Sequence, residues 1–341
     1  MPGCIIGGVT YTSGTSETTA PCEVCQPAQN AAAWTPAVSG TSCGGGGTCN
    51  GGACTYSAYT VGRDPVGLAF DGTNIWTANL GSETVTKLVA STGAVVGTYT
   101  VGSAPVGTAP QAIAFDGMNI WVANGDDPGT VTKLLASTGA IVGAYSVGAS
   151  PQGLVYDGTN MWVAGNTGTV TKLLATSGAV VGTYTVSADP VMTFDGTNVW
   201  VLSNAGSSPG TLTKFLASTG AVVGTYSVNV TDGAGVAMTF DGTNLWVSIT
   251  GDDFGVVAKV LASTGATVGS YEGGGGGITF DGTNIWVVDG EDPDTVAKLL
   301  PNTGATVGTY SVGSSPSAIL FAGANIWVAN EGGSSVTKIA D

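Results

Sequence analysis

The chain has 341 residues, 56 of them glycine, with only 9% charged residues and a formal net charge of −15. An acidic surface repels nucleic acid and anionic membranes, and no apolar run reaches the roughly 18 residues of a membrane span, so neither partner is expected. The absence of histidine removes the commonest general base and the commonest metal ligand.

Residues 1–54 are predicted to form a small module held by disulfide bonds. All six cysteines lie in this Gly-, Ser- and Thr-rich segment: Cys4, Cys22, Cys25, Cys43, Cys49 and Cys54. An even number of cysteines in a short segment with few apolar residues is typical of a disulfide framework, and the sequence does not choose among its pairings. A zinc site is less favoured, because Cys22 and Cys25 lack a second pair at the same spacing.

Disulfides imply an oxidising environment, so an extracellular, cell-surface or virion-surface location is expected. The first residues, MPGCIIGGVTYTSG, lack the basic stretch and apolar core of a signal peptide. Export by a route other than a visible leader, or removal of a leader before this start, is therefore expected.

From about residue 62 to its end, the chain repeats one sequence, with FDGTNIWVAN followed after a variable loop by TVTKLLASTGAVVGTYTVG. One tryptophan marks each copy: Trp76, Trp121, Trp162, Trp200, Trp246, Trp286 and Trp327. Their spacings are 45, 41, 38, 46, 40 and 41 residues. A period near 40 residues built from strand-like segments is the signature of a β-propeller with one four-stranded blade per repeat. We therefore expect an all-β fold in which residues 55–341 form a seven-bladed propeller, with the tryptophans packed between blades.

Each copy divides into four predicted strands, named A to D in chain order. In the first copy they cover residues 65–70, 74–79, 83–90 and 94–101, and all are rich in β-branched and aromatic residues. Asp-Gly separates strands A and B and Ser-Thr-Gly separates strands C and D, both typical of tight turns.

The two ends of the repeat region complement each other. The last copy stops at SSVTKIAD, a strand C with no strand D after it, while residues 55–62 (TYSAYTVG) match a strand D. Residues 55–62 are therefore predicted to complete the last blade, which would leave no open sheet edge between the first and last blades.

Lysine and aspartate recur at fixed positions. Every lysine occupies the same place in strand C: Lys87, Lys133, Lys172, Lys214, Lys259, Lys298 and Lys338. Six copies carry aspartate at the A–B turn: Asp71, Asp116, Asp157, Asp195, Asp241 and Asp281. The favoured interpretation is that each lysine stem packs between blades while its ammonium pairs with such an aspartate. The alternative is a cationic ring that binds an anion.

The B–C and D–A loops, which share one face of a propeller, vary in length and chemistry, whereas the A–B and C–D turns on the other face barely change. Variation concentrated on one face of a uniform scaffold predicts a recognition surface. Three B–C loops carry clustered carboxylates: Asp126, Asp127, Asp252, Asp253, Glu291, Asp292 and Asp294. Oxygen-rich turns of this kind suit Ca²⁺, although none has the EF-hand spacing, and a solvated acidic loop is the alternative. No other cofactor is predicted.

The segments WVAN, TVTKL and TYTVG, with a following proline such as Pro65, Pro105 or Pro151, resemble the YVTN-type β-propeller repeats of bacterial and archaeal surface proteins. The resemblance covers about residues 55–341 and implies the fold. The repeats are also similar to streptogramin B lyase propellers, which are metal-assisted enzymes with a catalytic histidine, and this chain has none. CQPAQNAAAW and GTSCGGGGTCNGGAC are similar to cysteine-rich modules of large secreted bacterial proteins.

These patterns predict a non-enzymatic structural or adhesive propeller with no catalytic residues. Its expected role is that of a subunit in a filament or a virion adhesin, as a homo-oligomer or with other structural subunits. The variable face would bind a glycan, a cell-surface receptor or neighbouring copies. The alternative is a metal-assisted small-molecule lyase or hydrolase of the streptogramin lyase type, working at the acidic loops.

Overall fold

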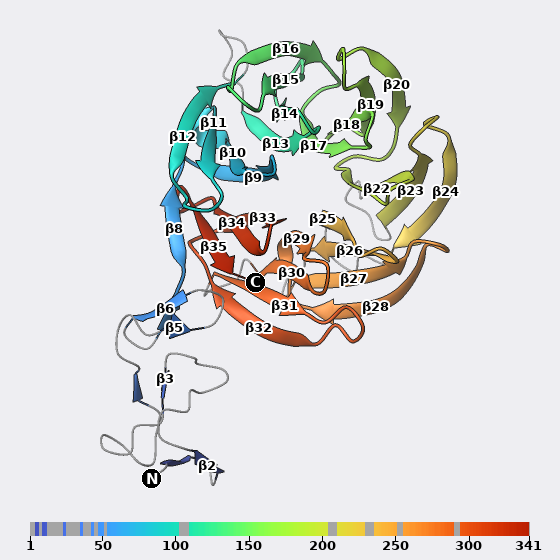
Figure 1. The fold of residues 1–341 in the computed structure, drawn as a ribbon. Helices are drawn as coiled ribbons and strands as arrows, with labels where there is room; N and C mark the ends of the chain where they lie inside the picture. The colour runs from blue at the N-terminus through green and yellow to red at the C-terminus, as the bar shows by residue number, and fades with distance from the viewer. Residues whose placement is uncertain are drawn as a thin grey trace.

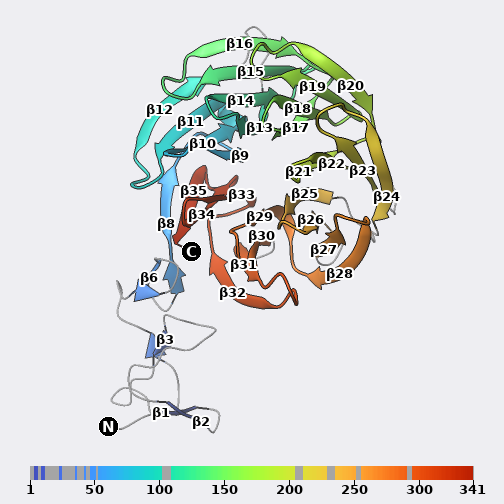
Figure 2. The same cartoon turned by 45° about the vertical axis from the view of Figure 1, so that its right-hand side comes forward.

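The structure is a computed structural model that describes residues 56–101, 109–203, 210–228, 235–250, 255–289 and 294–340, with the backbone of seven short strands before them and the side chain of Cys49. The described residues form seven four-stranded antiparallel sheets arranged in a ring (Figures 1 and 2). The predicted seven-bladed β-propeller is therefore confirmed. In the described part, no helix has the length and apolar character to cross a membrane.

Each blade runs outward from strand A, beside the central channel, to strand D on the rim. The A strands are β9 (Pro65–Phe70), β13 (Pro110–Phe115), β17 (Pro151–Tyr156), β21 (Val191–Phe194), β25 (Gly235–Phe240), β29 (Gly275–Phe280) and β33 (Pro316–Ala322). The B strands are β10 (Asn74–Asn79), β14 (Asn119–Asn124), β18 (Asn160–Gly165), β22 (Asn198–Ser203), β26 (Asn244–Ile249), β30 (Ile285–Asp289) and β34 (Asn325–Asn330).

The C strands are β11 (Thr84–Val89), β15 (Thr130–Leu135), β19 (Thr169–Leu174), β23 (Gly210–Leu216), β27 (Val256–Leu261), β31 (Thr295–Leu299) and β35 (Ser335–Ala340). The D strands are β12 (Val95–Thr100), β16 (Ile141–Ser146), β20 (Val180–Thr185), β24 (Val222–Val228), β28 (Ala266–Glu272), β32 (Thr306–Ser311) and β8 (Ser57–Thr60). In the first blade, strands A and B match the predicted bounds, while C and D are each one residue shorter at both ends. A short 3-10 helix, η1 (Leu80–Ser82), forms its B–C loop.

The ring closes through the N-terminal strand. Strand β8 pairs antiparallel with β35, with Ala58 opposite Thr337 and Tyr59 opposite Val336, and the sheet order is β33-β34-β35-β8. Strand β33 of the same blade lies against β9 of the first blade. The prediction that residues 55–62 complete the last blade is confirmed, with the paired part limited to Ser57–Thr60.

The N-terminal region contributes small sheets of its own. Its strands are β1 (Cys4–Ile6), β2 (Val9–Tyr11), β3 (Glu23–Val24), β4 (Thr35–Pro36), β5 (Ser42–Cys43), β6 (Gly47–Asn50) and β7 (Ala53–Thr55). Cys49 is buried and takes part in a disulfide bond. The side chains of the other five cysteines lie outside the described residues, so the disulfide framework stays a prediction.

Tryptophan and tyrosine side chains fill the spaces between blades. All seven repeat tryptophans are 0% exposed, and each packs on the following blade, as Trp76 does on Ile120 and Leu134. Within its own blade, Trp76 stacks on Tyr99 of strand D with 5.6 Å between ring centroids. Tyr99 in turn lies on the C–D turn of the next blade, where a Cβ at Gly139 would stand 2.0 Å from its ring. This close approach explains why the Ser-Thr-Gly turn hardly changes.

Candidate functional site

The face formed by the A–B and C–D turns, here called the constant face, holds its carboxylates in internal hydrogen bonds. In the second blade, Asp116 Oδ2 accepts from the Trp121 indole Nε1 at 2.7 Å. Its Oδ1 accepts from the backbone N–H groups of Asn119 at 2.6 Å and Met118 at 2.9 Å. The same indole-to-carboxylate bond recurs in blades 1–6, at Asp71, Asp116, Asp157, Asp195, Asp241 and Asp281.

These hydrogen bonds stabilise the ionised carboxylates. Burial opposes ionisation of Asp116, but the bonds from Trp121, Asn119 and Met118 outweigh it and hold its pKa below the usual value. The pKa is lowered in the same way at four further turns: Asp71, Asp195, Asp241 and Asp281. The oxygens are thus engaged by the turn that carries them, which gives them a structural role.

The lysines stack on tryptophan. Trp121 and Lys133 lie directly opposite each other on strands β14 and β15, and Lys133 Nζ stands 5.0 Å from the centroid of the indole. The ammonium then donates to the Ala175 carbonyl of the next blade at 2.6 Å. The Nζ-to-centroid distance is between 4.6 and 5.5 Å in all seven blades, within the range of cation–π attraction. Six lysines tie their blade to the next one through such a carbonyl: Lys87, Lys133, Lys172, Lys214, Lys259 and Lys338.

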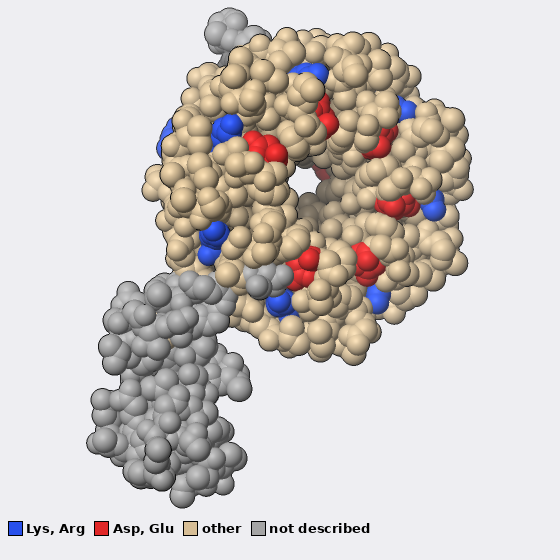
Figure 3. All heavy atoms as spheres, viewed as in Figure 1, with Lys and Arg blue, Asp and Glu red and all other residues tan. Residues whose placement is uncertain are grey.

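This arrangement corrects the predicted lysine–aspartate ion pairs. Among the described residues, one pair lies within 4.0 Å, between Lys298 Nζ and Asp281 Oδ2 at 3.9 Å. The prediction was wrong for Lys87, Lys133, Lys172, Lys214 and Lys259. The physical reason is that the carboxylate bonds to the edge of the indole while the ammonium lies over its face and turns to a carbonyl. Figure 3 shows the acidic groups nearer the channel and the basic groups farther out.

The face formed by the B–C and D–A loops is here called the variable face. Between its second and fourth blades, backbone hydrogen bonds join successive loops. The Ser150 N–H donates to the Asp126 carbonyl at 3.0 Å, and the Asn166 N–H donates to the Ser150 carbonyl at 3.0 Å. The Asp189 N–H then donates to the Asn166 carbonyl at 2.9 Å, which extends the series to the fourth blade. These loops therefore form one connected surface.

The D–A loops also hold strained backbone. Four non-glycine residues with a left-handed φ of 45° to 53° stand directly before the proline that precedes or begins strand A: Asp64, Ser150, Asp189 and Ser315. Non-glycine residues rarely adopt this conformation, and such strain gathers at functional sites. The variable face is thus the better candidate for a binding surface.

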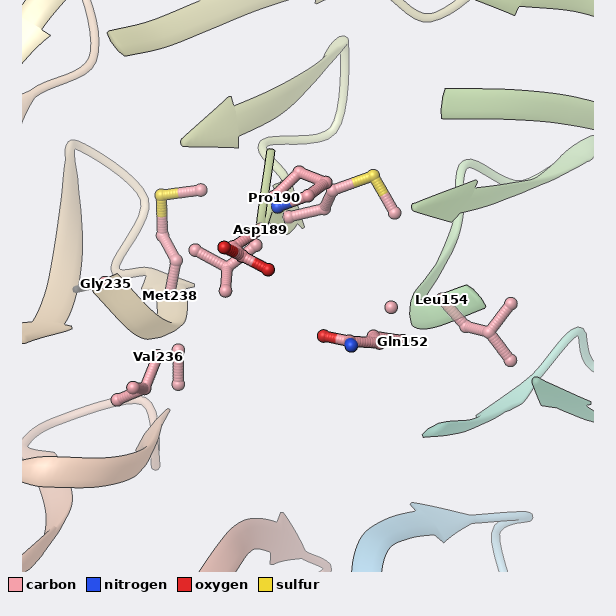
Figure 4. A pocket seen from close by; sticks show the side chains of 11 residues that line it. Gln152, Leu154, Asp189, Pro190, Gly235, Val236 and Met238 are labelled. Atoms are coloured by element: carbon pink, nitrogen blue, oxygen red, sulfur yellow. The ribbon is translucent and has the colours of Figure 1, made fainter. Parts of the chain in front are cut away.

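A pocket of about 440 Å³ opens in the channel beside these loops, between the innermost strands β17, β21 and β25 (Figure 4). Its lining residues are Gln152, Gly153, Leu154, Asp189, Pro190, Val191, Met192, Gly235, Val236, Ala237 and Met238. The Asp189 carboxylate and the Gln152 amide both point into the open space (Figure 4), and Met192 and Met238 contribute thioethers to the lining. A second hollow of about 390 Å³ lies farther around the channel, along β29 and β33.

The predicted calcium ligands are only partly described. Asp126 is half-buried and Asp127 is exposed in the B–C loop of the second blade, and Asp294 is half-buried. Asp252, Asp253, Glu291 and Asp292 lie outside the described residues. The described part holds no group of three or more His, Cys, Asp or Glu side chains that could bind a metal ion. Calcium binding at these loops therefore stays a prediction.

Sequence reasoning missed the channel pocket. Gln152, Asp189, Met192 and Met238 come from three different blades, so no local motif unites them. A signal was nevertheless present, because the second residue of strand A differs between copies (Val66, Gln111, Gln152, Val236 and Ser317) while the strand ends stay similar.

Comparison with known proteins supports the fold. No protein family and no curated protein matches the chain. Among solved structures, Kuenenia stuttgartiensis hydrazine synthase is similar, with a TM-score of 0.73 and 17% sequence identity over 83% of this chain and 97% of that chain. At this identity the likeness shows a shared β-propeller fold alone, and the YVTN and streptogramin lyase resemblances stay interpretations of the repeat sequence. The chain is therefore shown to be a seven-bladed β-propeller.

Proposed function

We propose that this propeller is a non-enzymatic structural or adhesive subunit of a larger extracellular or virion-surface assembly. Its variable face binds a glycan, a receptor or neighbouring subunits. The observation that carries the proposal is the contrast between the two faces. The repeated charged groups of the constant face are engaged in contacts within the chain, whereas the variable face carries the changing loops, most of the non-glycine residues with a left-handed φ and the channel pocket.

The pocket chemistry supports a polar ligand with apolar faces. Asp189 accepts hydrogen bonds and Gln152 both donates and accepts them, while Met192 and Met238 offer adaptable apolar contact. A carbohydrate presents hydroxyl groups along its edges and C–H groups on its faces, so it suits this mixture of side chains. Converging polar groups beside apolar side chains are a common feature of small-ligand sites.

The N-terminal region supports a place outside the cell. Six cysteines lie within residues 1–54, and the one whose side chain is described is disulfide-bonded. Stable disulfides form mainly in oxidising surroundings. The resemblance of the repeats to surface-protein propellers points the same way.

The proposal is tested by binding of the full chain to a panel of immobilised glycans. We expect Gln152→Ala with Asp189→Ala, and separately replacement of residues 125–129 by the shorter residues 166–168, to weaken binding at least tenfold. Met118→Thr is the matched control, because it changes a 67% exposed side chain on the constant face and should leave binding unchanged. Equal loss in the control, or turnover of a small-molecule substrate by the wild-type chain, would contradict the proposal.

Electron microscopy of the purified native particle tests the assembly. Filaments or regular particles are expected, and single propellers at every concentration would contradict a role as an assembly subunit.

A further inference from the structure

Six blades carry one extra residue in strand A, the strand beside the channel. In the third blade, Pro151 pairs with Gly165 and Gly153 with Ala164, so Gln152 has no partner on strand β18. The same shift of register occurs in blades 1, 2, 5, 6 and 7. Such a β-bulge takes the unpaired residue out of the regular alternation of the sheet. The unpaired residues are Val66, Gln111, Gln152, Val236 and Ser317, with glycine at this place in the sixth blade.

The fourth blade lacks this extra residue. The segment from proline to the aromatic residue that ends strand A covers residues 190–194 in this blade but residues 151–156 in the third. Strand β21 accordingly pairs with β22 without a shift of register. The channel pocket lies at this blade, between β21 and the A strands of its two neighbours. The second hollow lies at the sixth blade, where the extra residue is glycine and has no side chain. Each hollow thus opens where the side chain of a bulge residue is missing.

Asp189 supplies the charge of the channel pocket. Its backbone is held in place, because its φ is 51°, its N–H donates to the Asn166 carbonyl at 2.9 Å and the buried Pro190 follows it. Its exposed side chain points into the open space (Figure 4). Among the described residues that line the two hollows, Asp189 has the one ionisable side chain.

The basic side chains of the protein are all engaged away from this carboxylate. The chain has eight lysine and arginine residues, all of them described. The seven lysines lie over the repeat tryptophans, and Arg63 donates to the Gly81 carbonyl in the first blade. Within the described part, Asp189 is not among the carboxylates in an ion pair. A positively charged group of a ligand would therefore gain an attraction that the chain itself does not use.

The remaining lining of the pocket suits a sugar that carries this charge. The Gln152 amide can both donate and accept hydrogen bonds, as pairing with a hydroxyl group requires, and it points into the same open space as Asp189 (Figure 4). Leu154, Met192 and Val236 offer apolar contact to the C–H face of a ring. The volume of about 440 Å³ lies within the range of about 300–1,000 Å³ of small-ligand sites.

We propose that the channel pocket selects a sugar with a free, positively charged amino group, which pairs with the Asp189 carboxylate while a hydroxyl group bonds to the Gln152 amide. The inference rests on the proposed role in glycan binding and names the class of glycan. A neutral sugar leaves the carboxylate without a counter-charge, and an acidic sugar is repelled by it.

Isothermal titration calorimetry of the full chain with two matched ligands tests the proposal. One is a short chitosan oligomer, and the other is the fully N-acetylated oligomer of the same length, which keeps the rings but has no charge. A weakly acidic buffer keeps the amino groups charged. We expect the chitosan oligomer to bind at least tenfold more tightly, and this preference should shrink as the salt concentration rises.

Matched variants locate the preference. Asp189→Asn should remove most of it, because asparagine keeps the size of the side chain and tolerates a left-handed φ but has no charge. Glu272→Gln is the control, since it removes the same charge from an exposed position on β28 at the rim, and it should keep the preference. Both variants should melt like the wild type. Insertion of valine between Pro190 and Val191 restores the length of strand A and should weaken binding of both oligomers.

The other outcomes contradict the proposal in distinct ways. Equal affinity for the two oligomers, or an unchanged preference in Asp189→Asn, overturns the amino-sugar site and leaves glycan binding by the variable face standing. An equal loss in Glu272→Gln assigns the preference to net charge and overturns the site as well. A lysine oligomer that binds as tightly as the chitosan oligomer would show that charge alone is recognised. If neither oligomer binds, the amino-sugar site is wrong, and the panel of immobilised glycans decides separately whether any glycan is bound.

Discussion

Blades 1–6 and the seventh blade hold the same tryptophan in different surroundings. The first six place an aspartate on the indole N–H, but the seventh has Ala322 at that position, and the buried Trp327 Nε1 has no hydrogen-bond partner among the described residues. Trp327 is nevertheless 0% exposed, and Lys338 still lies over it at 5.5 Å. Packing and the lysine therefore position the tryptophan, while the aspartate satisfies its N–H group.

The outer strands differ as well. In blades 1–6 strand D follows strand C through a tight turn, but β8 has only four residues and comes from the other end of the chain. The A–B turn of the seventh blade, between β33 and β34, is strained too. Ala324 in this turn has a φ of 96°, a conformation that non-glycine residues rarely adopt. We therefore expect the seventh blade to be the least stable part of the ring.

Removing the closing strand should have the largest effect. Deletion of residues 55–62 exposes the edge of β35 and the core around Trp327, so we expect stable folding to be lost. Thermal unfolding followed by circular dichroism measures this. Deletion of residues 1–54, which keeps the strand, should retain a cooperative transition. A folded monomer with an unchanged melting temperature after deletion of 55–62 would refute the account of closure.

A matched pair of substitutions should separate packing from hydrogen bonding. Trp121→Phe and Trp327→Phe remove the same volume, but only the first leaves a carboxylate, Asp116, without its indole donor. We expect Trp121→Phe to lower the free energy of unfolding by about 1–2 kcal/mol more than Trp327→Phe. Urea unfolding measures the difference, and equal losses would show that the indole bond contributes nothing.

Ala322→Asp should stabilise the seventh blade, because it offers the Trp327 N–H an acceptor. The near-complete burial of Asp281, 8% exposed in the sixth blade, shows that the position tolerates a carboxylate. We expect a gain of about 1 kcal/mol in the free energy of unfolding, with a smaller gain for the neutral Ala322→Asn. Urea unfolding of the three chains tests this, and a loss in both variants would contradict it.

The turn aspartates should also make the free energy of unfolding depend on pH in the acidic range. Folding lowers the pKa of Asp71, Asp116, Asp195, Asp241 and Asp281. A lowered pKa stabilises the fold above the unfolded pKa of about 3.9, and this contribution is lost as the pH falls through the folded value. The free energy of unfolding should therefore fall below about pH 4, and the gain of Ala322→Asp should fade there. A gain that persists in acid would show that the carboxylate is not responsible.

Much of the fold could be predicted because the local sequence of each repeat indicates its strands and turns. The tryptophan spacing gave the number of blades, and the match of residues 55–62 to a strand D gave the closure. The lysine contacts could not be predicted in this way, since Lys133 reaches a carbonyl 42 residues away on the next blade. The indole bond had a visible signal, an aspartate five residues before tryptophan in six copies.

The candidate site was predictable only as a face. Loop variation pointed to the side of the ring where the pocket opens, but the pocket combines Gln152, Asp189 and Met238 from separate blades. Whether these side chains come close together depends on how the blades pack around the channel, and the sequence of a single repeat does not indicate that packing.

Closure of the ring by its own N-terminal strand is the central structural claim, and a disulfide test addresses it most directly. Ala58 and Thr337 are paired across β8 and β35, so a chain with Ala58→Cys and Thr337→Cys should form a new cross-link within one monomer, identified by peptide mapping. Ala58→Cys with Ser335→Cys is out of register and should link poorly. Absence of the link, or a link only between two copies, would contradict closure within the chain.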